Sequence, residues 1–417
     1  MKILMAHNWY FVGGGADRVF FETMKLLEKH GHTVVPFSMK DKRNYDSAYK
    51  EYFVNEIDYS TIKPSRGNLK TAMRMIYSFE AKKKIDALIQ KTRPDIAHLH
   101  NIYGRLTPSI LYALKKNKVP VIMTLHDYKL ICPAYDMTSS GKPCERCRGG
   151  RFYNAFIRKC VKESYLASLV YAAESSVHSL LRTYVNNISY FIAPSLFLKN
   201  KMIEFGIPEK KIEYIPNFIN GNVDYSSNTE DDYFLYLGKL LHVKGVFTLL
   251  RAFKNIKKSQ LHIAGNGELR SELEDYAKKN NINNVRFLGH LNSEEMFKAL
   301  KGTKFVVLPT ECYENAPLAV LEAFANGKPV IGANIGGIPE MVIGEETGLL
   351  FEPGNHEDLR QKINYLLNNP SKVLEMGRNA RQKVEKEYNA ELHYQRLIAL
   401  YEKVLNQLNP SLTVNAP

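Results

Sequence analysis

Short apolar runs alternate with longer segments of helical periodicity along this chain, and the alternation occurs twice. The runs of the first series lie at residues 3–8, 32–37, 95–100, 121–125 and 190–193. Those of the second series lie at residues 233–238, 261–265, 285–289, 305–309, 329–332 and 348–351. Such alternation is typical of a parallel sheet covered by helices. The sequence therefore predicts an α/β fold of two doubly wound, Rossmann-like domains.

A linker rich in Asn, Ser and Asp, residues 217–232, separates the two series. The chain has 417 residues, more than one ordinary core of about 150 residues requires. We therefore expect an N-terminal domain over residues 1–216, with a cysteine-containing insert at 128–162, and a C-terminal domain over 217–390. Residues 391–417 are expected to form a helix that packs back on the N-terminal domain.

The hydropathy pattern predicts a cytosolic protein. After Lys2, the apolar run at the N-terminus is shorter than the apolar region of a signal peptide. The longest apolar candidate, residues 166–177, is broken by Ser, Glu and Tyr, whereas a membrane span needs about 18 apolar residues.

The positive charge is confined to the N-terminal half. Residues 1–216 contain 34 Lys and Arg against 19 Asp and Glu, while the rest contains 23 against 24. Such an excess favours an anionic partner, with nucleic acid, an acidic membrane surface and a phosphorylated substrate as candidates. A basic surface that is simply solvated is the alternative.

Residues 70–91 mix apolar and basic side chains in the way expected of a helix on an anionic bilayer. Met73 and Phe79 stand among basic residues that include the triplet Lys82, Lys83 and Lys84. We therefore expect the protein to associate peripherally with the inner face of the cell membrane through this segment.

Two lysines flank the loop after the first strand of the second series. Gly238 and Lys239 follow that strand, and Lys244 with Gly245 precedes the next helix. Two ammonium groups and a helix N-terminus on one loop predict an anion site. Two cations suit a diphosphate whose charge must be stabilised during bond cleavage. Either lysine taken alone is more often a surface residue.

Two glutamates follow the run at 305–309. Glu314 lies in a polar loop, and Glu322 lies in a helix expected to start near Pro317, among apolar neighbours. A buried glutamate needs a polar partner, which the hydroxyls of a ribose would supply. A Glu322 that is partly exposed or caps a local element is the alternative.

These residues belong to a larger pattern. Its parts are Glu314-x7-Glu322, Ala-Asn-Gly-Lys-Pro-Val-Ile at 325–331, Gly-Gly-Ile-Pro-Glu at 336–340, Leu-Gly-Lys-Leu at 237–240, Lys244-Gly245, and the glycine-rich segment 13–19. The pattern covers nearly the whole chain and resembles the donor-site signature of the retaining glycosyltransferases of family 4. The resemblance implies the GT-B fold, in which two Rossmann-like domains face a cleft, and a nucleotide diphosphate sugar as donor.

The resemblance also implies roles for the lysines and glutamates. Lys239 and Lys244 match the pair that binds the diphosphate, although the family more often has Arg at the position of Lys239. Glu314 matches the residue that contacts the donor sugar at the catalytic centre, and Glu322 the residue that holds the ribose.

The remaining donor residues implied by the resemblance lie in three loops. Asn315, Ala316 and Leu318 occupy the loop whose backbone approaches phosphate and sugar, and His290 lies in the turn against the base. Gly14 and Gly15 belong to the N-terminal loop that borders the donor phosphates, although a triple glycine alone is more often a flexible turn.

His126 ends another strand of the first series and matches the family's N-domain histidine, which implies a catalytic role in hydrogen bonding to the donor sugar. One histidine among 12 is by itself usually inert.

Four of the five cysteines lie between one strand and helix of the first series, with the spacing C-x11-C-x2-C-x12-C: Cys132, Cys144, Cys147 and Cys160. This spacing in a cytosolic chain predicts a structural zinc site, with four reduced thiols as the alternative. No Asp-x-Asp motif occurs, so we expect catalysis without a divalent metal or other cofactor.

The resemblance implies hexosyl or similar transfer to a hydroxyl of a glycan or lipid-linked glycan acceptor, in the assembly of capsule, lipopolysaccharide O-antigen or exopolysaccharide. A GT-B enzyme that epimerises or hydrolyses nucleotide sugars is the alternative among enzymes. A basic nucleic-acid-binding protein is the alternative of another class. Because it would leave Glu314 and Glu322 unexplained, we expect no nucleic acid partner.

Overall fold

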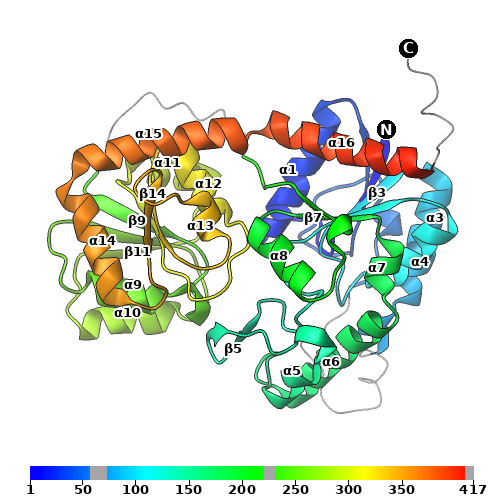
Figure 1. Cartoon of the computed structure of the whole chain (residues 1–417), viewed down its shortest axis with the longest axis horizontal. Helices are drawn as coiled ribbons and strands as arrows, with labels where there is room; N and C mark the ends of the chain where they lie inside the picture. The colour runs from blue at the N-terminus through cyan, green and yellow to red at the C-terminus, as the bar shows by residue number, and fades with distance from the viewer. Residues whose placement is uncertain (57–72, 220–230, 409–417) are drawn as a thin grey trace. The chain divides into compact units, whose positions relative to one another are not determined.

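The computed structural model describes residues 1–56, 73–219 and 231–408, and the chain divides into two compact units (Figure 1). Unit 1 comprises Met1–Asp136, Glu145–Ile215 and His393–Pro417, and unit 2 comprises Met137–Cys144 and Pro216–Leu392. Part of the cysteine-containing insert therefore groups with unit 2, although the sequence places the whole insert in the N-terminal domain.

Unit 1 is built on a six-stranded parallel sheet with the order β2-β1-β3-β4-β7-β8. The strands are β1 (Lys2–Ala6), β2 (Thr33–Phe37), β3 (Ile96–Leu99), β4 (Val121–Thr124), β7 (Tyr190–Ala193) and β8 (Ile212–Tyr214). The helices are α1 (Gly15–Lys29), α3 (Phe79–Thr92), α4 (Ser109–Lys116), α5 (Tyr153–Ile157), α6 (Tyr165–Leu180), α7 (Thr183–Asn187) and α8 (Leu196–Glu204).

The last helix, α16 (Ala390–Leu408), completes the core of unit 1. Its residues Leu397 and Tyr401 are fully buried and belong to the same apolar cluster as Ile3 of β1 and Phe20 of α1. Strands such as β1 are apolar on both faces because helices cover both sides of a parallel sheet.

Unit 2 repeats the architecture with the strand order β11-β10-β9-β12-β13-β14, all parallel. The strands are β9 (Tyr233–Leu237), β10 (Gln260–Ala264), β11 (Val285–Gly289), β12 (Val306–Leu308), β13 (Val330–Ala333) and β14 (Gly348–Phe351). The helices are α9 (Val246–Phe253), α10 (Arg270–Lys279), α11 (Ser293–Gly302), α12 (Leu318–Ala325), α13 (Ile338–Met341), α14 (His356–Asn368) and α15 (Pro370–Glu387).

Two apolar clusters lie on opposite faces of the sheet in unit 2. Phe234 and Tyr236 of β9 belong to one cluster and the intervening Leu235 to the other, because successive strand residues point to opposite faces. The first cluster includes side chains of α9, α10 and α14, and the second includes side chains of α12 and α15. The doubly wound α/β class predicted from the sequence is confirmed.

Short elements complete the fold. They are the two-stranded antiparallel hairpin of β5 (Thr138–Ser139) and β6 (Lys142–Pro143), and the 3-10 turns η1 (Lys50–Tyr52), η2 (Arg148–Gly150), η3 (Glu209–Lys211) and η4 (His242–Lys244). None of the helices that the structure describes combines the length and apolar character needed to cross a bilayer.

Candidate functional site

The carboxyl ends of the parallel strands in unit 2 bring the predicted donor residues to one edge of the sheet. Lys239 follows β9, His290 follows β11, and Glu314 follows β12. Lys239 and His290 are exposed, whereas Glu314 is partly buried. Open α/β sheets bind ligands at this edge, at the topological switch point, where the chain leaves two neighbouring parallel strands toward opposite sides of the sheet.

That switch point lies between β9 and β12, because β10 follows β9 on one side and β12 lies on the other. Lys244, from the loop after β9, donates a hydrogen bond through Nζ to Oε1 of Glu314, from the loop after β12. The exposed fractions of the two side chains are 27% and 19%. The structure therefore places a partly exposed ammonium group at the position where such folds bind ligands.

Glycines allow these loops to approach one another. Gly245 has φ +67°, and a Cβ there would lie 1.8 Å from the backbone oxygen of Pro309. Gly336 has φ +64°, and its Cβ would lie 2.3 Å from the backbone oxygen of Glu314. The same oxygen accepts a hydrogen bond of 2.8 Å from the N–H of Gly337. The backbone of Glu314 is thus held by the N–H of Gly337 and packs against Gly336, where a larger residue would clash.

Glu311 connects the two loops, although it is not among the residues that the sequence predicts for the site. Its N–H donates to the Val243 oxygen over 2.8 Å, and its carboxylate accepts from the Thr248 hydroxyl over 2.6 Å. The Thr310 hydroxyl also donates to Val243, over 3.1 Å. A glutamate beside the end of a strand is the only signal that the sequence offers for this positioning role.

Glu322 lies on α12 and is 6% exposed, so it is buried, as the sequence suggested, and the alternative of partial exposure is wrong. Its backbone oxygen accepts a hydrogen bond of 2.8 Å from the Asn326 side chain at the end of the helix. Asn315, Ala316 and Leu318 are partly exposed at the start of α12.

Unit 1 gathers histidines at the carboxyl ends of its strands. His7 follows β1, His100 follows β3, and His126 lies just after β4. Nδ1 of His100 lies 2.7 Å from Nε2 of His126, and the two rings are stacked. Burial lowers the pKa of His126 to about 4 and that of His7 to about 3. At neutral pH both imidazoles are therefore neutral, so His126 can exchange hydrogen bonds without carrying charge.

The glycine-rich loop is tied to the same edge of unit 1 through Asp17 of α1. Oδ2 of Asp17 accepts a hydrogen bond of 2.9 Å from the N–H of Gly13, and Oδ1 lies 3.3 Å from Nε2 of His7. Gly14 has φ −172°, an extended backbone that any residue adopts, so its own dihedral angles do not require glycine. Gly15 begins α1 and is exposed.

Both parts of the chain match known families. Residues 222–383 match the model described as "Glycosyl transferases group 1", and residues 13–222 match that described as "Glycosyltransferase Family 4". The chain belongs to glycosyltransferase family 4. The family and the GT-B fold class predicted from the sequence are confirmed.

Relatives of this glycosyltransferase match most of the chain. An uncharacterised glycosyltransferase of Methanocaldococcus jannaschii is 24% identical over 412 residues, covering 98% of this chain and 99% of that protein. The O-antigen chain mannosyltransferase C of Escherichia coli is 24% identical over 308 residues, covering 72% of this chain and 81% of that protein. The structure of Anabaena HepE in complex with UDP-glucose has a TM-score of 0.68 at 17% identity and covers 97% of this chain and 100% of that chain.

Asp127 of the glycosyltransferase follows His126 and is not among the predicted site residues. Burial raises the pKa of Asp127 to about 7, although the N–H of Lys129 donates to its carboxylate over 2.9 Å. An unfolded aspartate titrates near pH ~3.9. The proton is therefore bound more tightly in the folded chain, and the stability this provides is lost as the pH rises through about 7.

We expect Asp127→Asn to stabilise the glycosyltransferase increasingly as the pH rises. The variant cannot ionise, so it avoids the cost of the buried carboxylate, which amounts to up to about 4 kcal/mol above pH ~7. Urea unfolding of wild type and variant at several values between pH ~4 and ~8 measures this difference. If the difference in unfolding free energy between variant and wild type does not change with pH, the raised pKa of Asp127 is contradicted.

The four predicted zinc ligands divide between the two units. Among the described residues, no group of three or more His, Cys, Asp or Glu side chains is arranged to hold a metal ion. Cys147 and Cys160 contribute to one small apolar cluster of unit 1, whereas Cys144 belongs to unit 2. None of the five cysteines, all within the described residues, forms a disulfide bond, and the zinc site stays a prediction from the spacing.

The segment predicted to lie on a membrane does not form the expected helix. Lys70 lies outside the described residues, and α3 begins only at Phe79. Lys84 donates a hydrogen bond to the Phe53 oxygen and lies 3.7 Å from Glu80. Residues 77 and 78 interrupt the helical segment, so the expectation of one continuous helix over 70–91 is wrong. One face of α3 is buried in unit 1, whereas Met73 and Phe79 are 62% and 80% exposed. Association of this segment with a membrane stays a prediction.

Proposed function

We propose that this glycosyltransferase transfers a hexosyl group from a nucleotide diphosphate sugar to a hydroxyl of a glycan or lipid-linked glycan, with retention of anomeric configuration. The observation that carries the proposal is the Lys244 to Glu314 pair at the switch point of unit 2. Structural likeness to HepE, whose structure holds UDP-glucose, supports the choice of donor class.

The proposed roles follow from the chemistry of each group. Lys244 and Lys239 would bind the diphosphate and compensate the charge that develops as the bond from C1 of the sugar to the phosphate oxygen breaks. Glu314 would contact the sugar hydroxyls, and the buried Glu322 would accept hydrogen bonds from the ribose hydroxyls. His290 would lie against the base.

The acceptor oxygen would form the new bond to C1, and its proton would pass to the departing diphosphate. Neutral His126 would orient the sugar by hydrogen bonding, while Gly14 and Gly15 would leave room for the phosphates. Two lysines supply the compensating charge, so catalysis is proposed to need no divalent metal.

We propose that the enzyme acts in the assembly of a cell-surface polysaccharide, such as capsule, O-antigen or exopolysaccharide. It would act at the inner face of the cell membrane. The relation to an O-antigen chain mannosyltransferase supports this choice. No nucleic acid partner is proposed.

A panel of nucleotide diphosphate sugars incubated with lipid-linked and soluble glycan acceptors tests the proposal. We expect a glycoside product that keeps the donor's anomeric configuration in its nuclear magnetic resonance spectrum, with turnover that persists in a chelator. Free sugar or an epimerised nucleotide sugar as the main product would instead establish the hydrolase or epimerase alternative. Inversion of configuration would contradict retention.

A further inference from the structure

Helix α6 of unit 1 has its polar residues inside and its apolar residues outside. The buried side chains are Ser168, Ala172, Glu174, Ser175 and His178. The opposite face exposes large apolar side chains, and Tyr165, Leu169 and Leu180 are 53%, 49% and 85% exposed. With 3.6 residues per turn these three exposed positions lie within about one sixth of the helix circumference. An ordinary surface helix has the reverse polarity.

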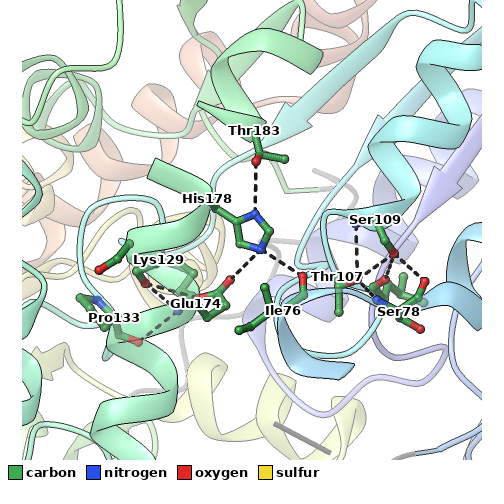
Figure 2. A network of polar contacts seen from close by, with 12 residues as sticks. Ile76, Ser78, Thr107, Ser109, Lys129, Pro133, Glu174, His178 and Thr183 are labelled. Carbon is green, nitrogen blue, oxygen red and sulfur yellow. Dashed lines mark hydrogen bonds and ion pairs between the residues drawn. The ribbon is translucent and has the colours of Figure 1, made fainter. Parts of the chain in front are cut away.

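A buried polar network keeps α6 in this orientation (Figure 2). Nζ of Lys129 lies 2.6 Å from Glu174, and both side chains are only 3% exposed. His178 lies 3.2 Å from the Thr183 hydroxyl and 3.1 Å from the Ile76 oxygen. Rotating the helix would break the network and leave a buried charge without its partner, which costs several kcal/mol. The apolar face is therefore held toward solvent.

Helix α5 extends the apolar face. It packs against α6, and its Tyr153 and Ile157 are 58% and 61% exposed. The rings of Phe156 and Tyr165 lie 5.4 Å apart, which links the two helices at the surface. We name this the α5–α6 surface and define it by Tyr153, Ile157, Tyr165, Leu166, Leu169 and Leu180. A surface of this apolar character on a water-soluble domain marks an interaction site.

Cations surround the α5–α6 surface. Residues 145–182 include seven Lys and Arg against three Asp and Glu. Two of the three acidic residues, Glu145 and Glu174, are paired with Lys201 and Lys129. Arg158, Lys159 and Lys162 are exposed between the two helices, and Lys159 lies 4.4 Å from the centre of the Tyr165 ring. The unpaired charge near the surface is thus mainly positive.

We propose that the α5–α6 surface binds an anionic lipid bilayer. Its leucines and aromatic rings enter the boundary between headgroups and acyl chains, while the flanking Arg and Lys pair with lipid phosphates. Binding at this surface would bring the enzyme to a lipid-linked acceptor in the membrane. Only this purpose of the binding rests on the proposed function.

The charge pattern favours a bilayer over a second copy of this chain. A two-fold symmetric dimer places the same patch on both sides of the interface, so Arg158, Lys159 and Lys162 of two copies would approach one another. An anionic bilayer complements the same residues.

Flotation of the full chain with vesicles of phosphatidylcholine, with and without phosphatidylglycerol, tests the proposal. We expect wild type to bind the anionic vesicles at low salt and to be released at high salt. Leu169→Ser with Leu180→Ser should weaken binding about tenfold or more, because two large side chains no longer enter the bilayer. The matched control, Tyr365→Ser with Leu374→Ser, changes two side chains of unit 2 that are each 41% exposed and should bind as wild type does.

A second pair of variants tests the charged residues. Arg158→Gln with Lys159→Gln should weaken binding and reduce its salt dependence, whereas Lys82→Gln with Lys83→Gln on α3 should leave both unchanged. Vesicle binding is read without any sugar transfer, so its failure is distinguishable from failure of the proposed function.

Three results would overturn the proposal. The wild type does not bind anionic vesicles, the leucine variants bind them as tightly as wild type, or the α3 variants lose binding while the Arg158 and Lys159 variants keep it. Sedimentation velocity adds a further check. Self-association of wild type that the leucine variants abolish, without vesicle binding, would assign the surface to a second copy.

Discussion

Lys244→Ala is expected to lower kcat/KM for sugar transfer by roughly 10²- to 10³-fold while the protein remains folded. Lys244 is the ammonium group at the switch point of unit 2, and its side chain is partly exposed and bonded to Glu314. Removing it takes away one of the two cations proposed to compensate the developing diphosphate charge. It also leaves the Glu314 carboxylate to repel that charge.

Two further variants make this measurement specific. Lys244→Arg keeps the charge and should recover part of the rate. Lys257→Ala removes an exposed lysine that precedes β10, at the opposite end of the strands, and should leave the rate unchanged. A Lys244→Ala enzyme with the wild-type value of kcat/KM would remove Lys244 from the proposed site.

Gly245→Ala is expected to destabilise unit 2 by about 3 kcal/mol or more. The added Cβ would lie 1.8 Å from the Pro309 oxygen, a backbone atom, and the φ of +67° is itself unfavourable for alanine. The loops after β9 and β12 would have to separate, which would move Lys244 away from Glu314. Donor affinity should therefore fall together with stability.

Gly344→Ala provides the matched control, because a Cβ at Gly344 meets no atom within 4 Å. Urea unfolding of the two variants and wild type measures the difference. Equal stability of Gly245→Ala and wild type would mean that the loops are not held as closely as the structure has them.

The periodicity of the sequence was sufficient to predict the strands that build the site. Every predicted apolar run contains a strand, because parallel strands buried on both faces are apolar throughout. The short edge strand β8 was missed, since Ile212–Tyr214 is only partly buried and carries Glu213. Because Lys239, Lys244 and Glu314 follow the ends of such strands, they could be placed at the carboxyl edge of the sheet in unit 2.

Contacts between loops could not be predicted in this way. The bond from Lys244 to Glu314 depends on the order of β9 and β12 in the sheet, which the chain order does not reveal. The role of Glu311 and the stacking of His100 on His126 depend on the same packing.

The outward apolar face of α6 shows a different limit of sequence reasoning. A helical period in the sequence shows that one face of a helix is more apolar than the other. That the apolar face points into the protein is an additional assumption. The buried Lys129 to Glu174 pair reverses that assignment. Periodicity likewise did not indicate that Lys84 of the lysine triplet in α3 donates a hydrogen bond to the Phe53 oxygen inside unit 1.

The central claim is that a nucleotide-sugar site lies at the carboxyl ends of the strands of unit 2. Calorimetric titration with a panel of nucleoside diphosphates tests this claim most directly. We predict saturable binding of one nucleoside diphosphate per chain. We expect this binding to weaken at least about tenfold in Glu322→Ala, because the ribose hydroxyls lose a charged acceptor, and to be unchanged in Lys257→Ala. Absence of binding by every nucleoside diphosphate, or equal affinity in wild type and Glu322→Ala, would contradict the claim.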